Sequence, residues 1–182
     1  MAAVNGNQMN LADISQTVVS FIQQHQAWAP FIVGALAFAE SMAIISFIVP
    51  ATGILLAIGA LLAASGIPFW PVWAGAMTGA VLGDWISYAV GYWLKDSIRD
   101  YWPFSRAPHF MDKAEAFTRK WGVPGVFIGR FSGPLRAFVP LAAGVFHLPH
   151  IPFQIANISS AAVWSFGILL PGEALDWFRH LQ

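Results

Sequence analysis

The sequence contains no cysteine, and only 10% of its 182 residues are charged. The absence of cysteine excludes a disulfide framework, a thiol nucleophile and a cysteine-based metal site. A typical soluble domain carries about 25% charged residues, so the low charge content argues against that class. The nine Lys and Arg are balanced by nine Asp and Glu, which leaves no overall basic field to indicate a nucleic-acid partner.

Apolar side chains take the place of the missing charges. Hydrophobic residues make up 57% of the sequence, and the mean hydropathy is +0.61. The first ten residues carry no Lys or Arg and no apolar core, so a cleavable signal peptide is not expected. The composition predicts one integral membrane domain over residues 1–182, inserted by its own membrane segments.

The first half of the chain shows three kinds of segment. Residues 11–26 place apolar side chains at helical spacing between polar ones, which predicts an amphipathic helix at the membrane interface. The apolar tract at residues 28–66 hardly holds two spans of about 20 residues and a turn, and Pro50 and Gly53 interrupt it. We therefore expect a broken or re-entrant helical hairpin there, followed by one full span at residues 69–95.

The densest positive charge comes after this span. Six of the nine Lys and Arg lie within residues 95–120. The positive-inside rule therefore predicts a cytoplasmic connecting loop at about residues 96–108. Apolar side chains at helical spacing return after the loop, with charges between them, which predicts a second interfacial helix that ends at Gly122.

The last third of the chain is again apolar. Residues 124–148 form a tract that Gly133, Pro134 and Pro140 are expected to break into a second hairpin. Residues 151–178 are long enough for a second full span.

The chain thus repeats one order of segments: an amphipathic helix, a broken apolar hairpin and a full span. We expect an all-α integral membrane protein of two inverted-repeat halves, at residues 11–95 and residues 109–178. The halves place opposite charges, Glu40 and Arg130, ten residues before the proline of a shared Val-Pro pair. Inverted repeats with discontinuous helices are typical of secondary transporters, whose site lies near the membrane midplane.

Four ionisable side chains lie inside the predicted membrane segments: Glu40, Asp84, Arg130 and Arg136. Each unpaired charge near the bilayer centre costs about 2.5–3.5 kcal/mol on insertion scales. Two anions and two cations can offset most of this cost by pairing. One interpretation is that they only form buried ion pairs that fix the hairpins. The other is that they line a polar cavity for an ion or an anionic headgroup.

The spacing of the two arginines bears on this choice. On an unbroken helix, six residues turn the chain by about 600°, so the two side chains would point away from each other. A break at Gly133-Pro134 can turn Arg130 and Arg136 toward one cavity. Two guanidiniums suit a phosphate, which arginine binds in a bidentate fork. Glu40 or Asp84 would then be a counter-charge or exchange a proton.

Other polar residues give weaker signals. Thr52, Asn157 and Ser160 are candidates for lining the cavity, although Ser and Asn are also common in the packing of membrane helices. His147 and His150 have no ligand spacing with other His, Asp or Glu, so no metal site is expected. The sequence shows no phosphate-binding glycine loop and no nucleophile elbow. We therefore expect neither an enzyme nor a cofactor.

These residues resemble the DedA family of bacterial inner-membrane proteins. The likeness is carried by Glu40 before "FIVPATG", by "GDWISYAVG", by "WGVPGVFIGRFSGPLRAFVPLAAG" and by "NISSAAVW", within residues 28–170. The resemblance implies two opposed re-entrant hairpins, as in eukaryotic lipid scramblases. It also implies a role in moving lipids such as undecaprenyl phosphate or phosphatidylethanolamine, with an acidic residue near Glu40 and arginines like Arg130 and Arg136 essential. Some members are implicated in proton-dependent transport.

The sequence departs from the family pattern in two places. Many members have an acidic residue in the segment where this chain has Thr52, so proton coupling would rest on Glu40 or Asp84. The family's Pro-Gly between the arginines is here Gly133-Pro134. The leading hypothesis is a lipid transporter of the bacterial cytoplasmic membrane, with a homo-oligomer left open. The alternatives are a proton-coupled small-solute exporter or osmotic-stress protein, and a passive structural protein.

Overall fold

The computed structural model describes residues 17, 20, 24, 26–42, 52–65, 67–100, 105 and 108–180, and every regular element among them is helical. Short 3₁₀ helices η1 (Gln26–Trp28), η2 (Lys95–Asp100) and η4 (Gly133–Ala137) accompany α2 (Ala29–Ser41), α4 (Thr52–Ser65), α5 (Phe69–Leu94), α6 (Pro108–Gly129), α7 (Phe138–Val145) and α8 (His150–His180). The predicted all-α fold is therefore confirmed. The predicted helix at residues 11–26 falls almost entirely outside the described residues.

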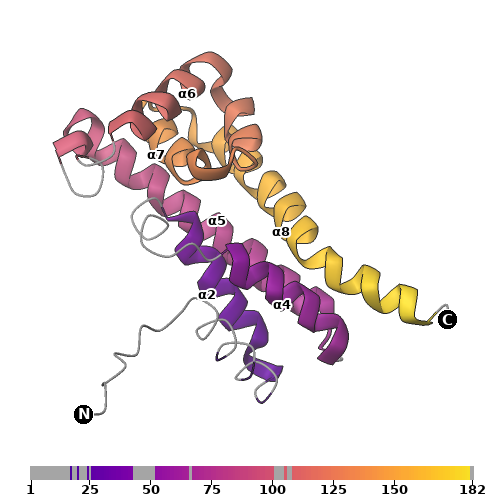
Figure 1. Ribbon diagram of the computed structural model, residues 1–182. Helices are drawn as coiled ribbons and strands as arrows, with labels where there is room; N and C mark the ends of the chain where they lie inside the picture. The colour runs from indigo at the N-terminus through magenta and orange to yellow at the C-terminus, as the bar shows by residue number, and fades with distance from the viewer. Residues whose placement is uncertain are drawn as a thin grey trace, which may run out of the picture.

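The long helices α5 and α8 form the frame of the molecule and run in opposite directions (Figure 1). Near the start of α5, the Trp73 indole donates a hydrogen bond to the carbonyl of Ala162 at 3.2 Å. Near its end, the Tyr88 ring stacks on Phe153 with the ring centres 4.2 Å apart. By length and composition together, the described helices include one candidate span, His150–Leu170.

The four shorter helices lie within the predicted segments: α2 and α4 in the first apolar tract, α6 across the predicted interfacial helix and the start of the second apolar tract, and α7 within that second tract. In Figure 1, α2 lies along one part of α5, and α7 lies against its other end with α6 beside α7. The first arms, α2 and α6, pack on the long helix of their own half, α5 and α8 respectively. The second arms are exchanged, because α4 packs on α8 and α7 packs on α5. The two halves therefore hold each other through these second arms.

Glycines bring the helix backbones into contact. A Cβ atom at Gly79 of α5 would stand 1.9 Å from the carbonyl oxygen of Gly34 in α2. A Cβ atom at Gly144 of α7 would stand 2.0 Å from the carbonyl oxygen of Tyr88 in α5. Any side chain at these positions would separate the helices, so both crossings depend on glycine.

One helix is broken at a glycine with a positive φ angle. Gly122, with φ 56°, divides α6 into an amphipathic segment and an apolar segment, which agrees with the helix end predicted there. Of the two residues predicted to interrupt the first tract, Pro50 lies outside the described residues. Gly53 is the second residue of α4 rather than part of a break.

One expectation about the breaks is wrong in detail. Pro140 does not interrupt the second hairpin, because it lies in the first turn of α7, where a missing N–H costs no helical hydrogen bond. The predicted connecting region at 96–108 begins with η2, whose Ile98 side chain is buried in the core shared by α5, α6, α7 and α8. Most of residues 101–107 lie outside the described residues.

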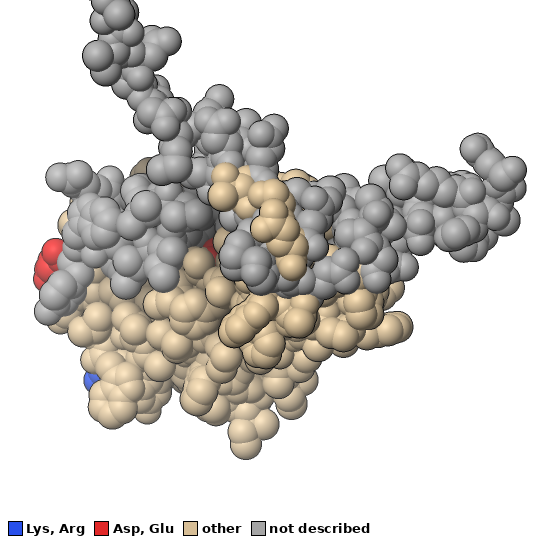
Figure 2. Space-filling model, turned by 90° about the horizontal axis from the view of Figure 1, so that it is seen from below, with Lys and Arg blue, Asp and Glu red and all other residues tan. Residues whose placement is uncertain are grey.

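The surface is largely apolar. The face shown in Figure 2 has few charged side chains among its described residues. Trp93, Phe31 and Ile151 are 80%, 70% and 72% exposed. Exposed apolar surface on this scale is expected of a protein whose solvent is lipid.

Candidate functional site

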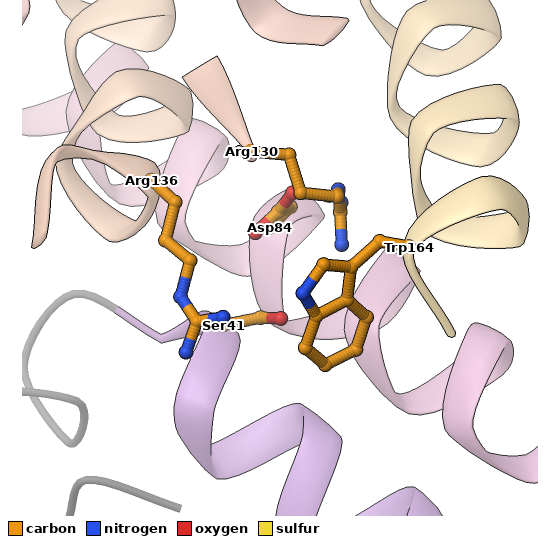
Figure 3. Close-up of a pocket in the computed structure, with 5 residues that line it drawn as sticks. All are labelled: Ser41, Asp84, Arg130, Arg136 and Trp164. Carbon is orange, nitrogen blue, oxygen red and sulfur yellow. The ribbon is translucent and has the colours of Figure 1, made fainter. Parts of the chain in front are cut away.

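The four intramembrane charges meet where the two halves join. Glu40 is near the end of α2, and Asp84 lies in the second half of α5. Arg130 directly follows α6, and Arg136 belongs to η4. Figure 3 shows Asp84, Arg130 and Arg136 around one small space, with Ser41 and Trp164 beside them. The structure therefore brings together residues from five separate elements or turns.

Arg130 is buried and is held by three side chains. Its Nη2 atom donates hydrogen bonds to Oδ2 of Asp84 and, at 2.8 Å, to Oδ1 of Asn157. Its Nε atom donates to Oγ of Ser160 at 3.0 Å. Asp84 comes from the first half of the chain, so this ion pair joins the two halves. Among the described residues, Nη1 of Arg130 has no hydrogen-bond acceptor, which leaves two N–H groups without a protein partner.

Arg136 forms the second ion pair. Its Nη2 atom donates to Oε1 of Glu40, whose side chain is only 1% exposed. The Arg136 guanidinium carbon also lies 5.4 Å from the ring centre of Trp164, a cation–π distance. The second ion pair therefore also joins the two halves, and an aromatic face from α8 covers the cation.

The chain between the arginines explains why they meet. The helix ends at Gly129, and a turn follows in which Phe131 N–H donates to Ile128 and Ser132 N–H donates to Gly129. Gly133 then takes φ 58°, a conformation that favours glycine, and the chain enters η4. This break turns Arg136 back toward Arg130, as the spacing on an unbroken helix would not.

The cavity between the arginines is very small. Ser41, Asp84, Arg130, Arg136 and Trp164 line a cavity of about 10 Å³. That is about the space that one water molecule needs. The two carboxylates balance the two guanidiniums, so the site is neutral as a whole. It is an internally paired site with room for little more than one water molecule.

The structure places the weaker candidates as follows. Asn157 and Ser160 are fully buried and both contact Arg130, although they do not line the cavity itself. Thr52 is the first residue of α4, and its side chain lies outside the described ones. Within the described part of the chain, no group of three or more His, Asp or Glu side chains is arranged to hold a metal ion.

Two lining residues were not expected from the sequence. Trp164 is seven residues after Asn157 and four after Ser160, so helical spacing places all three on one face of α8. That spacing is a signal that could have indicated Trp164. Ser41 follows Glu40 directly, at the end of α2, and no sequence pattern distinguishes it.

Comparisons with known proteins show that the chain is similar to bacterial inner membrane proteins. The VTT domain family matches residues 49–174. The Escherichia coli inner membrane protein YabI is 32% identical over 152 residues, which are 84% of this chain and 60% of that protein. The Escherichia coli inner membrane protein YghB is 30% identical over 153 residues, which are 84% of this chain and 70% of that protein.

An uncharacterized membrane protein of Buchnera aphidicola is 29% identical over 155 residues, with 85% of this chain and 60% of that protein covered. The matched part of the chain thus spans 60% of the length of YabI and of the Buchnera protein. No solved structure shows a significant match to the chain.

Proposed function

Since this chain belongs to the DedA family of VTT-domain proteins and lies in the bacterial inner membrane, we propose that it moves a phosphate-bearing lipid across that membrane. The substrate would be a polyprenyl phosphate such as undecaprenyl phosphate, or a phospholipid such as phosphatidylethanolamine. Arg130 and Arg136 would hold the headgroup phosphate. No catalytic role and no cofactor are proposed.

One observation carries this proposal: two arginines of one hairpin line the same buried cavity, and each is balanced by a carboxylate from the other half. Guanidinium groups bind carboxylate and phosphate oxygens with the same geometry. A lipid phosphate could therefore replace Asp84 and Glu40 as the partner of Arg130 and Arg136. The two N–H groups on Nη1 of Arg130 would give an arriving phosphate its first contact.

The small size of the cavity explains why binding would require movement. A phosphate group is larger than the single water that the cavity can hold. Since both ion pairs run between the halves, exchange of a carboxylate for phosphate would loosen one half from the other. Movement of a hairpin against the rest would then admit the headgroup, while the acyl or prenyl chains stay in lipid.

The packing of the helices favours the inverted repeat that the sequence predicts. We propose that residues 11–95 and residues 109–178 are the two related halves. The exchanged second arms support this, because α4 lies on α8 just as α7 lies on α5. In transporters of this architecture, one repeat rocks against the other around a central site.

Because phosphate and the two carboxylates would compete for the arginines, transport could also be linked to protons. Glu40 and Asp84 hold the arginines only while they are ionised, so protonation of either would free an arginine for phosphate. Thr52, where many family members have an acidic residue, cannot take this role. The runner-up function, a proton-coupled exporter of a small solute, would use the same acid–arginine pairs without a lipid.

Reconstitution into liposomes tests the proposal. Wild-type protein should speed transbilayer movement of labelled phosphatidylethanolamine or of a polyprenyl phosphate over empty liposomes, and Arg130→Gln should abolish the increase. Arg119→Gln is the matched control, because Arg119 is an exposed arginine of α6 outside the cavity. Equal lipid movement by wild type and Arg130→Gln would show that Arg130 does not hold the headgroup. Solute flux that follows a pH gradient, without lipid movement, would favour the exporter.

A further inference from the structure

A row of polar side chains runs along one face of α8 and ends at the buried site. It consists of His150, Gln154, Asn157, Ser160 and Trp164, at intervals of four, three, three and four residues. These intervals keep all five on one side of a helix. Polar side chains inside a membrane helix are rare without a role, and only the last three of these contact the arginines.

The first three side chains of this row, His150, Gln154 and Asn157, contact one another in turn. Gln154 Nε2 lies 3.4 Å from His150 Nε2. Gln154 Oε1 accepts a hydrogen bond from Asn157 Nδ2 at 3.3 Å. Asn157 Oδ1 in turn accepts from Arg130 at 2.8 Å. The contacts therefore lead from an exposed histidine to a fully buried asparagine and on to the arginine.

The outer end of the row gains a further N–H donor from α5. The indole Nε1 of Trp85 donates to Nε2 of His150 at 3.1 Å, and Trp85 is 45% exposed. Two N–H groups, those of Trp85 and Gln154, thus converge on one imidazole nitrogen. That nitrogen has a single lone pair and can accept only one of them. A phosphate oxygen has more lone pairs and can accept from both donors.

The apolar surroundings suit the rest of a lipid. Ile151, Ile155 and Ile158 each lie one position after a member of the row. Their side chains are exposed, so a band of isoleucines runs beside the polar row. A molecule with a phosphate on the row and hydrocarbon on the band would satisfy both surfaces. This pairing is the chemistry of a membrane lipid rather than of a soluble anion.

We propose that Trp85, His150 and Gln154 form an outer docking site for the phosphate of a membrane lipid, from which Asn157 leads to Arg130. This inference rests on the proposed lipid transport and adds to it the route by which the headgroup reaches the arginines. The N–H donors of the docking site, the Trp85 indole and the Gln154 amide, carry no charge. The site would bind a phosphate more weakly than the arginines do, which favours passage inward.

The test measures transport as a function of lipid content. Liposomes of a phosphate-free glycolipid contain wild type or a variant and increasing mole fractions of headgroup-labelled phosphatidylethanolamine, so that no other lipid phosphate competes for the site. Gln154→Glu places a negative charge at the docking site with little change in size, and Trp85→Phe removes one N–H group but keeps an aromatic ring. Trp93→Phe is the matched control for Trp85→Phe. Trp93 is also an exposed tryptophan of α5, but it does not belong to the proposed docking site.

We expect Gln154→Glu to raise the half-saturating mole fraction at least about tenfold and Trp85→Phe to raise it about threefold, with the maximal rate little changed. A purely structural role would instead lower the maximal rate. Wild-type values for both variants, beside an inactive Arg130→Gln protein, would overturn the docking site and leave the proposed function standing. Absence of lipid movement by wild type itself would overturn the proposed function, and the docking site with it.

Discussion

Arg136 donates a hydrogen bond to Glu40, which lies 96 residues earlier in the chain and in the opposite half. Arg130 makes the corresponding contact to Asp84, 46 residues earlier. Both cations come from the short segment around η4, and both anions come from the first half. The segment that carries the proposed phosphate ligands is therefore also the segment whose ion pairs fasten the two halves together.

Removing one partner of such a pair should destabilise the protein. Glu40→Gln keeps the size of the side chain but leaves the Arg136 charge without its carboxylate. Loss of one partner of a buried ion pair costs about 3–5 kcal/mol, and the remaining cation–π contact with Trp164 should keep the loss near the lower end. The protein is heated in detergent micelles, and the loss of its monodisperse size-exclusion peak gives the unfolding temperature. The difference between the variant and wild type measures the loss of stability.

The double variant Glu40→Gln/Arg136→Gln is the control for this prediction. It removes both charges, so it should recover part of the stability that Glu40→Gln loses. If the double variant unfolds at a lower temperature than Glu40→Gln, the charge imbalance is not the cause of the loss.

Asn157→Ala should weaken the support of Arg130. The variant removes the acceptor at 2.8 Å from Nη2 and the bond from Nδ2 to the carbonyl of Val81. A loss of about 1–3 kcal/mol in unfolding free energy is expected, because buried donors and an acceptor lose their partner. Ser159→Ala is the comparison. Among the described residues, the exposed Ser159 hydroxyl bonds only to carbonyls of its own helix, so the effect of the variant should stay within about 0.5 kcal/mol. Equal effects of the two variants would contradict this account.

Gly79→Ala should disrupt the crossing of α2 and α5. The added methyl group would lie 1.9 Å from a backbone oxygen, and backbone cannot yield as the end of a flexible side chain can. We expect a loss of stability of several kcal/mol, or failure to obtain folded protein, in the same thermal assay. Gly167→Ala in α8 meets nothing within 4 Å and should be neutral or stabilising by up to about 1 kcal/mol. A folded Gly79→Ala protein with the wild-type unfolding temperature would disprove the close crossing.

Lys95→Gly should stabilise the end of α5. Lys95 has φ 50° and ψ −135°, nearly the conformation of Gly122, with φ 56° and ψ −135°. A side chain in this region strains the backbone by about 1–2 kcal/mol, and glycine relieves it. Gly122→Ala should lower the unfolding temperature for the converse reason. The prediction fails if the two variants shift the unfolding temperature in the same direction.

The sequence was sufficient to predict the helices and the meeting of the arginines, because apolar periodicity and the Gly133-Pro134 break are local features. It could not determine which carboxylate holds which arginine. That depends on how α2 and α5 pack around η4, and contacts between distant segments leave no local pattern. The prediction that Pro140 breaks the hairpin was wrong because proline is equally compatible with a break and with the first turn of a helix. The row on α8 is visible in its spacing, but its continuity to Arg130 becomes evident only with the side chains in place.

The central claim is that Arg130 and Arg136 hold a lipid phosphate, and a direct contact between guanidinium nitrogen and phosphorus tests it. The protein, labelled with ¹⁵N only in its arginines, is reconstituted with phosphatidylethanolamine or a polyprenyl phosphate and studied by ¹⁵N–³¹P dipolar recoupling in solid-state NMR. We predict dephased arginine signals in wild type and in Arg119→Lys, and their loss in Arg130→Lys/Arg136→Lys. Unchanged dephasing in that double variant, or none in wild type with either lipid, would contradict the account.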